Sequence, residues 1–253
     1  MRHNHPRRKK IESHILKVHK RSPASTYLKE VIYGGIDGII TTFAVVAGFS
    51  GAAFSNDTTT QLSFLVVLLF GLANLFADGV SMGLGSFLAV RSEKTLYNSI
   101  RTGEERESRC NEDIEAEETK LILMERGFSE VDAQTLTSIY QKNDQFWVDF
   151  LMHNELKITD PTEESPLYTG FATFISFISF GFIPLLPFMI VNKLDPQTVF
   201  IFSIFSTGVA LVLLGVLKWK IIGVDLIKSV LEIVLVGTVA ASVAFLVGTL
   251  FTL

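Results

Sequence analysis

The sequence predicts an all-α, polytopic membrane protein with five transmembrane helices and a cytoplasmic helical insert between helices 2 and 3. Apolar runs long enough to cross a hydrocarbon core of about 30 Å lie at 32–54, 62–90, 168–191, 197–217 and 229–252. Between the second and third runs, residues 91–168 hold 18 of the 26 Asp and Glu against 9 Lys and Arg. Such a stretch is too polar to lie in hydrocarbon. Its excess of negative charge predicts that cations bind nearby.

This pattern divides the chain into four parts. They are a basic tail with an amphipathic helix (1–30), transmembrane helices 1 and 2 (31–90), an acidic helical domain (91–167) and transmembrane helices 3 to 5 (168–253). The tail carries nine Lys and Arg. An excess of Lys and Arg marks the cytoplasmic side, so we expect the N-terminus and the insert in the cytoplasm and the C-terminus on the opposite side. No targeting extension is visible, so we expect a bacterial plasma membrane.

The composition narrows the classes of site and partner. The single cysteine, Cys110, excludes an intramolecular disulfide and a zinc site built from several cysteines. The basic tail, with Ile11, Ile15 and Val18 on one side of a short helix, suits a membrane surface. We therefore expect the lipid bilayer as a partner and no nucleic acid. We also expect no cofactor and no catalytic residues.

The first membrane helix carries an acid inside its apolar run. Asp37 lies about a turn and a half into the helix, and Thr41, Ala44 and Gly48 continue its face. A carboxyl group within a membrane is costly, so a functional role is the better default. The alternative is a carboxyl that stays protonated or reaches back to the interface.

The second membrane helix repeats this pattern. Asn74, Asp78 and Met82 are spaced four residues apart, which places two oxygen-bearing side chains and a thioether on one helix face. These are possible ligands for a metal ion along a membrane path. For Met82 two readings stay open, packing between helices and metal ligation.

The insert is predicted to hold three or four helical pieces. Residues 91–109 prolong the second membrane helix, and further helices cover 112–126, 129–140 and 143–157. Ser129 and Asp132 form a capping box at the start of the third piece.

Two glutamate pairs and a third helix suggest a metal cluster in the insert. Glu104/Glu107 and Glu115/Glu118 are each spaced by three residues, so the members of a pair are neighbours on a helix face. Met152 and Glu155 have the same spacing on a later helix. Carboxylate oxygens suit divalent cations such as Mn²⁺ and Fe²⁺. The alternative to a metal cluster is a row of charges that simply faces water. We expect this for Glu105, Glu112 and Glu117.

Two further features concern the last three membrane helices. Pro184 and Pro187 predict a kink in the third, and Glu232, four residues after Lys228, predicts an ion pair with that lysine at the cytoplasmic interface. The glycines of the first two helices permit close helix packing, which suggests that these helices lie near a homodimer interface.

Several motifs, taken together in this order, resemble the vacuolar iron transporter family. They are Asp37-Gly38 with Thr41-Thr42-Phe43-Ala44-Val45-Val46-Ala47-Gly48, Ser81-Met82-Gly83 leading into Arg91-Ser92-Glu93, the Glu-rich insert, and Ile183-Pro184-Leu185-Leu186-Pro187-Phe188. The likeness covers nearly everything after residue 27.

The resemblance implies a homodimer of five-helix subunits that moves Fe²⁺, often Mn²⁺ too, out of the cytoplasm in exchange for protons. It implies a cytoplasmic metal-binding domain whose ligands match Glu104, Glu107, Glu115, Glu118 and Glu155. It also implies a membrane path through Asp37 and Met82, with Glu30 near the cytoplasmic mouth.

This chain departs from the family pattern at three places. Asn74 stands where plant members have an acid, with Asp78 as an additional acid one turn later. A Met-Met pair is Leu151-Met152 here, and the proline between the two Glu pairs is absent.

Two other functions fit part of this sequence pattern. A carboxylate-bridged di-metal oxidase would use Glu-x-x-His motifs, and His153 is preceded three residues earlier by Phe150. A non-transporting protein whose insert docks a basic partner would leave Asp37, Asp78 and Met82 without a role.

Overall fold

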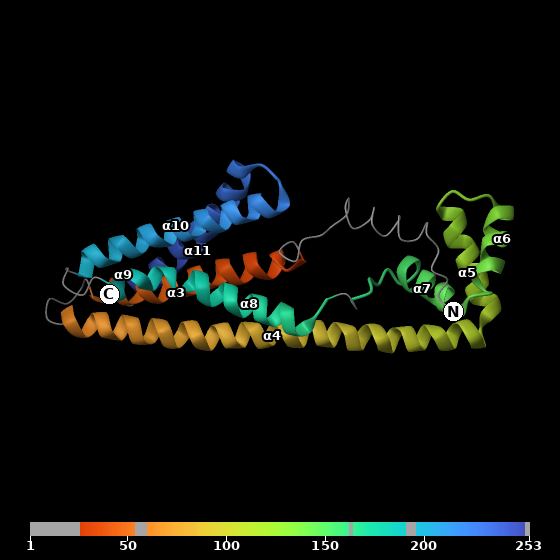
Figure 1. The fold of residues 1–253 in the computed structure, drawn as a ribbon, viewed down its shortest axis with the longest axis horizontal. Helices are drawn as coiled ribbons and strands as arrows, with labels where there is room; N and C mark the ends of the chain where they lie inside the picture. The colour runs from red at the N-terminus through yellow and green to blue at the C-terminus, as the bar shows by residue number, and fades with distance from the viewer. Residues whose placement is uncertain (1–25, 54–59, 162–163, 191–195, 251–253) are drawn as a thin grey trace, which may run out of the picture. The chain divides into compact units, whose positions relative to one another are not determined.

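The computed structural model describes residues 26–53, 60–161, 164–190 and 196–250, most of which are helical (Figure 1). The predicted amphipathic helix near residues 11–20 lies outside the described residues. The chain divides into two compact units, Met1–Ser86 with Tyr168–Leu253, and Phe87–Leu167. We call them the membrane unit and the insert.

Five segments are long and apolar enough to cross a membrane, which confirms the predicted fold class. They are Leu28–Phe49, Leu65–Cys110, Pro166–Ile190, Thr198–Ile222 and Leu226–Val243. They belong to helices α3 (Leu28–Ala53), α4 (Thr60–Cys110), α8 (Pro166–Gly181) with α9 (Leu186–Ile190), α10 (Pro196–Ile222) and α11 (Leu226–Leu250). The chain is therefore an integral membrane protein.

Helix α4 continues from the membrane unit into the insert without a break, as the sequence predicted. It has 51 residues, which at 1.5 Å per residue is about 75 Å. A hydrocarbon core needs only about 30 Å of helix. The C-terminal part of α4, which carries the charged residues after Val90, therefore extends beyond the hydrocarbon.

The third membrane segment is broken where its prolines predict. Helix α8 ends at Gly181, a short 3₁₀ turn covers Ile183–Leu185, and α9 follows. Because proline lacks an N–H, such a break leaves backbone groups that need other partners. Ser203 of α10 supplies one by donating its hydroxyl to the carbonyl oxygen of Pro184 at 2.8 Å.

Glycines let α8 pack closely against both α3 and α4. A Cβ at Gly38 of α3 would lie 2.3 Å from the carbonyl oxygen of Phe177, and one at Gly83 of α4 would lie 2.9 Å from Cβ of Phe174. Both contacts are within one chain, so these glycines serve packing inside the subunit. A homodimer interface near the first two helices stays a prediction, which these two glycines neither support nor contradict.

The membrane unit has two buried apolar clusters. One is centred on Phe43, Leu75 and Phe177, and the other on Ile39 and Leu214. The predicted ion pair of Glu232 with Lys228 is replaced by a pair with Lys218. Lys218 lies near the end of α10, beside the start of α11, so a cross-helix partner competes with the one on the same helix.

The insert combines the end of α4 with α5 (Glu112–Glu125), α6 (Glu130–Tyr140) and α7 (Asp144–Asn154). Ser129 caps α6 by accepting a hydrogen bond from the backbone N–H of Asp132, and Asn143 caps α7 in the same way through Phe146. The cap at Ser129 was expected from the sequence. A small core of Tyr97, Val148 and Met152 joins α7 to α4.

Candidate metal sites

Three glutamates from three segments of the insert converge on one point. Glu104 lies on α4, Glu115 on α5, and Glu155 follows the last residue of α7. Each offers a carboxylate oxygen, and these oxygens lie within 4.8 Å of one another. Such a set can hold a divalent cation, since three carboxylates supply the hard oxygen ligands that these ions prefer. We call these three residues the insert cluster.

The turn between α4 and α5 brings the two glutamate pairs together. Helix α4 ends at Cys110 and α5 starts at Glu112, so only Asn111 separates them. The side-chain amide of Asn111 donates to Oε2 of Glu107 at 2.6 Å. The amide thereby holds one member of the first pair next to the turn that leads to the second pair.

The insert cluster is partly buried, and each of its three carboxylates has an oxygen without a hydrogen-bond partner among the described residues. Glu104 is 9% exposed and Glu115 8% exposed. Glu104 Oε1, Glu115 Oε2 and Glu155 Oε2 have no hydrogen-bond partner among the described residues. Buried polar atoms are normally paired, so three unpaired oxygens at one point indicate a position prepared for a cation or for protons.

Burial and mutual repulsion change the protonation of the cluster. The pKa of Glu115 is raised to about 7. The largest cause is burial, and the nearby negative charges of Glu104, Glu118 and Glu107 add to it. The pKa of Glu155 is also raised to about 7, mainly by burial and then by the charges of Glu118 and Glu115. Without a metal the cluster therefore carries protons near neutral pH, and a cation that binds there must displace them.

The second members of the two pairs contribute charge to the same place. Glu118 acts on Glu155 and on Glu115 through its charge, and Glu107 acts on Glu115 in the same way. Both side chains are partly buried. All five predicted glutamates of the insert thus belong to one electrostatic group.

Met152 lies in the core of the insert. It is fully buried and packs with Tyr97 and Val148. This packing accounts for its burial, and its role as a metal ligand stays a prediction. His153, the residue that an oxidase reading would use, is exposed.

Trp147 connects α7 to the helix that carries two of the glutamates. Its side chain is buried, and its indole N–H donates to the hydroxyl of Thr119 at 2.8 Å. Thr119 in turn donates to the backbone carbonyl of Glu115 at 2.8 Å. Sequence reasoning missed this link, although a tryptophan in so polar a stretch is a signal, because buried tryptophans usually find a hydrogen-bond acceptor.

An ion-pair group fixes α7 to α4. Arg101 of α4 pairs with Asp149 of α7 and, at 3.3 Å, with Glu105. This also gives Glu105 a structural partner, which agrees with placing it outside the metal ligands. Together with Trp147, the pair holds α7 to both helices that bear the glutamate pairs.

In the membrane unit, the polar residues of α3 and α4 are neighbours. The amide of Asn74 donates to Oδ2 of Asp78 at 2.7 Å, as their four-residue spacing predicts. The carboxyl groups of Asp37 and Asp78 lie within range of a direct electrostatic interaction. An acid from each of two helices therefore faces the same region, with an amide beside one of them.

Three other predicted residues of the membrane unit are placed as follows. Thr41 donates to the backbone carbonyl of Asp37 at 2.8 Å, so its hydroxyl serves the helix backbone. Met82 is half-buried and packs against the cluster around Phe177. Glu30, in the first turn of α3, has an oxygen, Oε2, without a partner among the described residues.

The comparisons with known proteins agree with this architecture. A sequence profile described as the VIT family matches residues 28–249. A "Vacuolar iron transporter" of Toxoplasma gondii is 33% identical over 237 residues, covering 91% of this chain and 76% of that protein. "Vacuolar iron transporter 1" of Arabidopsis thaliana is 32% identical and covers 89% and 86%, and the "Vacuolar iron transporter" of Plasmodium falciparum is 32% identical and covers 87% and 81%.

The relatives are named as transporters rather than enzymes, in agreement with the expected lack of catalytic residues. The match includes the described apolar helices and the whole insert. The chain therefore belongs to the VIT family.

Proposed function

We propose that this protein transports Fe²⁺, and also Mn²⁺, out of the cytoplasm in exchange for protons. The observation that supports this most is the insert cluster, in which Glu104, Glu115 and Glu155 come within 4.8 Å with an unpaired oxygen on each. The relatives named as iron transporters make Fe²⁺ the first substrate to test.

The insert collects the metal. Its glutamates repel one another when ionised, and a divalent cation bound among them removes that repulsion. Glu107 and Glu118 add charge and further oxygens, and Met152 adds a thioether if α7 shifts to expose it. Metal capture releases protons, because Glu115 and Glu155 carry protons near neutral pH.

The membrane unit moves the metal. Asp37 and Asp78 supply carboxylates from two helices, and Asn74 holds Asp78 in place. A metal and a proton cannot occupy the same carboxylate oxygens cheaply, so Asp37 couples their movement. Met82 supplies a thioether, which favours transition-metal ions over Ca²⁺ and Mg²⁺.

The assembly and location follow from the same proposal. The protein acts as a homodimer in the bilayer, with its N-terminus and insert in the cytoplasm. The membrane is a bacterial plasma membrane, or a vacuolar membrane if the source is eukaryotic. The homodimer rests on the family resemblance, since Gly38 and Gly83 contact α8 of the same chain.

Uptake into proteoliposomes tests the proposal. Vesicles containing the full chain are given Fe²⁺, Mn²⁺ or Ca²⁺, with and without an imposed pH gradient, and a trapped dye reports lumenal pH. We expect uptake of Fe²⁺ and Mn²⁺ that accelerates with an acidic lumen and raises the lumenal pH. Uptake that ignores the gradient and leaves the dye unchanged contradicts proton exchange, and no uptake of either metal contradicts transport.

A further inference from the structure

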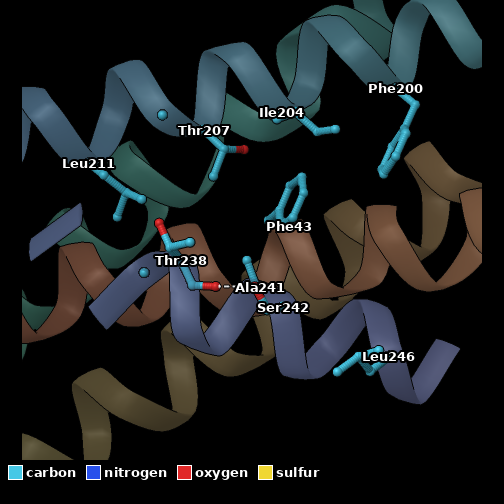
Figure 2. A pocket seen from close by; sticks show the side chains of 11 residues that line it. Phe43, Phe200, Ile204, Thr207, Leu211, Thr238, Ala241, Ser242 and Leu246 are labelled. Atoms are coloured by element: carbon cyan, nitrogen blue, oxygen red, sulfur yellow. Dashed lines mark hydrogen bonds between the residues drawn. The ribbon is translucent and has the colours of Figure 1, made fainter. Parts of the chain in front are cut away.

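A cavity of about 560 Å³ lies between α3, α10 and α11 of the membrane unit (Figure 2). Phe43 of α3 stands between the residues of α10 and those of α11. Gly208 of α10 borders the space, and a Cβ added there would meet no atom within 4 Å. The cavity therefore has room beside α10 that the chain itself does not fill.

The lining offers almost no polar atoms to a ligand. The hydroxyls of Thr207, Thr238 and Ser242 donate to the carbonyl oxygens of Ser203, Val234 and Thr238, each at 2.7 Å. No charged residue is among the described residues of the lining. The cavity lining therefore lacks the carboxylate ligands that Asp37 and Asp78 supply, and its hydroxyl hydrogens are already used by the helix backbone.

The cavity opens toward the lipid-facing side of the helices. Ile204 and Leu246 both line it and are themselves exposed. Phe205 of α10 and Val239 of α11, next in sequence to the lining residues Ile204 and Thr238, are also exposed and apolar. Because α10 and α11 are membrane-spanning segments, this surface faces hydrocarbon, and the cavity is continuous with it.

We propose that this cavity binds the acyl chain of a membrane lipid between α10 and α11. Hydrophobic transfer contributes little here, because the lipid tail is already in hydrocarbon. An unfilled space instead loses the dispersion contacts of every atom around it, and a flexible acyl chain can restore them. The volume is within the range of about 300–1,000 Å³ that ligand pockets span. The bound chain then holds α10, α11 and α3 together.

A photoreactive lipid tests this site. The full chain is reconstituted in nanodiscs with a trace of phosphatidylcholine that carries a diazirine in its acyl chain, and labelled peptides are mapped by mass spectrometry. Gly208→Phe fills the cavity from α10, and Gly85→Phe, at another glycine with nothing within 4 Å of its added Cβ, is the matched control on α4. We expect label on the cavity-lining peptides of the wild type and of the control, and background label there in Gly208→Phe.

A second variant keeps the test decisive if Gly208→Phe does not fold. Thr238 is exposed, so Thr238→Phe fills the cavity from α11 without entering the core, and it should remove the same label. Label spread evenly over all lipid-facing helices overturns the proposal, as does cavity label that survives both substitutions. A lower oligomeric mass in either filled variant, with no cavity label in the wild type, shows instead that a second copy covers the cavity.

Discussion

The insert and the membrane unit both use carboxylates, but they arrange them differently. In the insert, three acids from three segments meet with unpaired oxygens. In the membrane unit, Asp37 and Asp78 interact across two helices, and Asn74 already bonds one of them. Several acids can gather at low cost in a domain outside the hydrocarbon and bind a metal together, whereas each acid inside the hydrocarbon is costly. The proposed function accordingly places metal capture in the insert and metal movement at the pair of acids in the membrane unit.

The largest expected effect separates these two tasks. Asp37→Asn should reduce metal uptake and the lumenal pH response to background, because it removes the carboxylate of α3 that metal and proton share. Metal binding by the insert, measured by calorimetry on the full chain in detergent, should be unchanged. Glu232→Gln is the matched control, since this acid pairs with Lys218 instead. Wild-type uptake by Asp37→Asn contradicts the assignment and makes Asp78 the next residue to test.

Changing the insert cluster should instead weaken metal binding by the insert. The triple change of Glu104, Glu115 and Glu155 to Gln should weaken Mn²⁺ binding by about 100-fold or more, or about 2.7 kcal/mol, because the ligands lose their charge. Changing the exposed Glu112, Glu117 and Glu125 to Gln removes the same number of charges and should weaken it far less. Equal losses in both triples would mean that overall charge, rather than a defined site, attracts the metal.

The next effect in size is the dependence of the insert's stability and metal affinity on pH. Glu115 and Glu155 have pKa values raised from 4.5 to about 7 in the folded protein. The metal-free folded state therefore holds more protons than the unfolded state between these values, and its stability should fall as pH rises from about 5 to 8. Metal affinity should rise over the upper part of that range, since fewer protons compete.

Two readouts follow this dependence in the full chain. Mn²⁺ binding at pH 8 should release fewer protons than at pH 6.5, which calorimetry in buffers of different ionisation enthalpy detects. The emission of Trp147, in a Trp219→Phe background, reports unfolding of the insert, because the chain has two tryptophans. A metal-free insert that is equally stable at pH 5 and pH 8 contradicts the raised pKa values.

A smaller effect is expected from the link between α7 and α5. Trp147→Phe keeps most of the buried ring but removes the donor to Thr119, which should destabilise the insert by about 1–3 kcal/mol. Because Trp147 supports the helix that bears Glu115, Mn²⁺ affinity should fall by about tenfold. The matched control is Trp219→Phe in the membrane unit. Unchanged affinity in Trp147→Phe would show that the cluster does not depend on this hydrogen bond.

The smallest effect concerns metal choice in the membrane unit. Met82→Ala should lower the rate of Fe²⁺ uptake and reduce its preference over Ca²⁺, because the thioether favours softer ions. Met82→Leu separates ligation from packing, since leucine keeps the bulk that contacts the cluster around Phe177. If leucine restores the preference for Fe²⁺, Met82 acts through packing alone.

The fold was largely predictable because its signals are local. Apolar runs of sufficient length identify the membrane helices, and Ser129 and Asn143 mark helix starts through caps that involve residues three positions away. The break at Pro184 follows from the missing N–H of proline. Glu232 shows the limit, since a partner on the next helix replaced the one four residues away on its own helix.

The candidate sites were only partly predictable. Spacing identified which glutamates share a helix face, but the meeting of Glu104, Glu115 and Glu155 depends on how α4, α5 and α7 pack. The hydrogen bond from Trp147 to Thr119 joins residues 28 positions apart. The spacing of residues along a single helix cannot predict a contact between two different helices. The glycines have the same limit. Gly38 and Gly83 predict that some helix packs closely, but the sequence does not say that this helix is α8.

The most direct measurement of the central claim is the position of a bound metal. Anomalous scattering from crystals of the full chain grown with Mn²⁺ locates the ion independently of any assumed ligand. We predict a peak within coordination distance of Glu104, Glu115 and Glu155, and its loss when these three are changed to Gln. A peak at Glu105, Glu112 or Glu117, with none at the three converging carboxylates, would contradict the account.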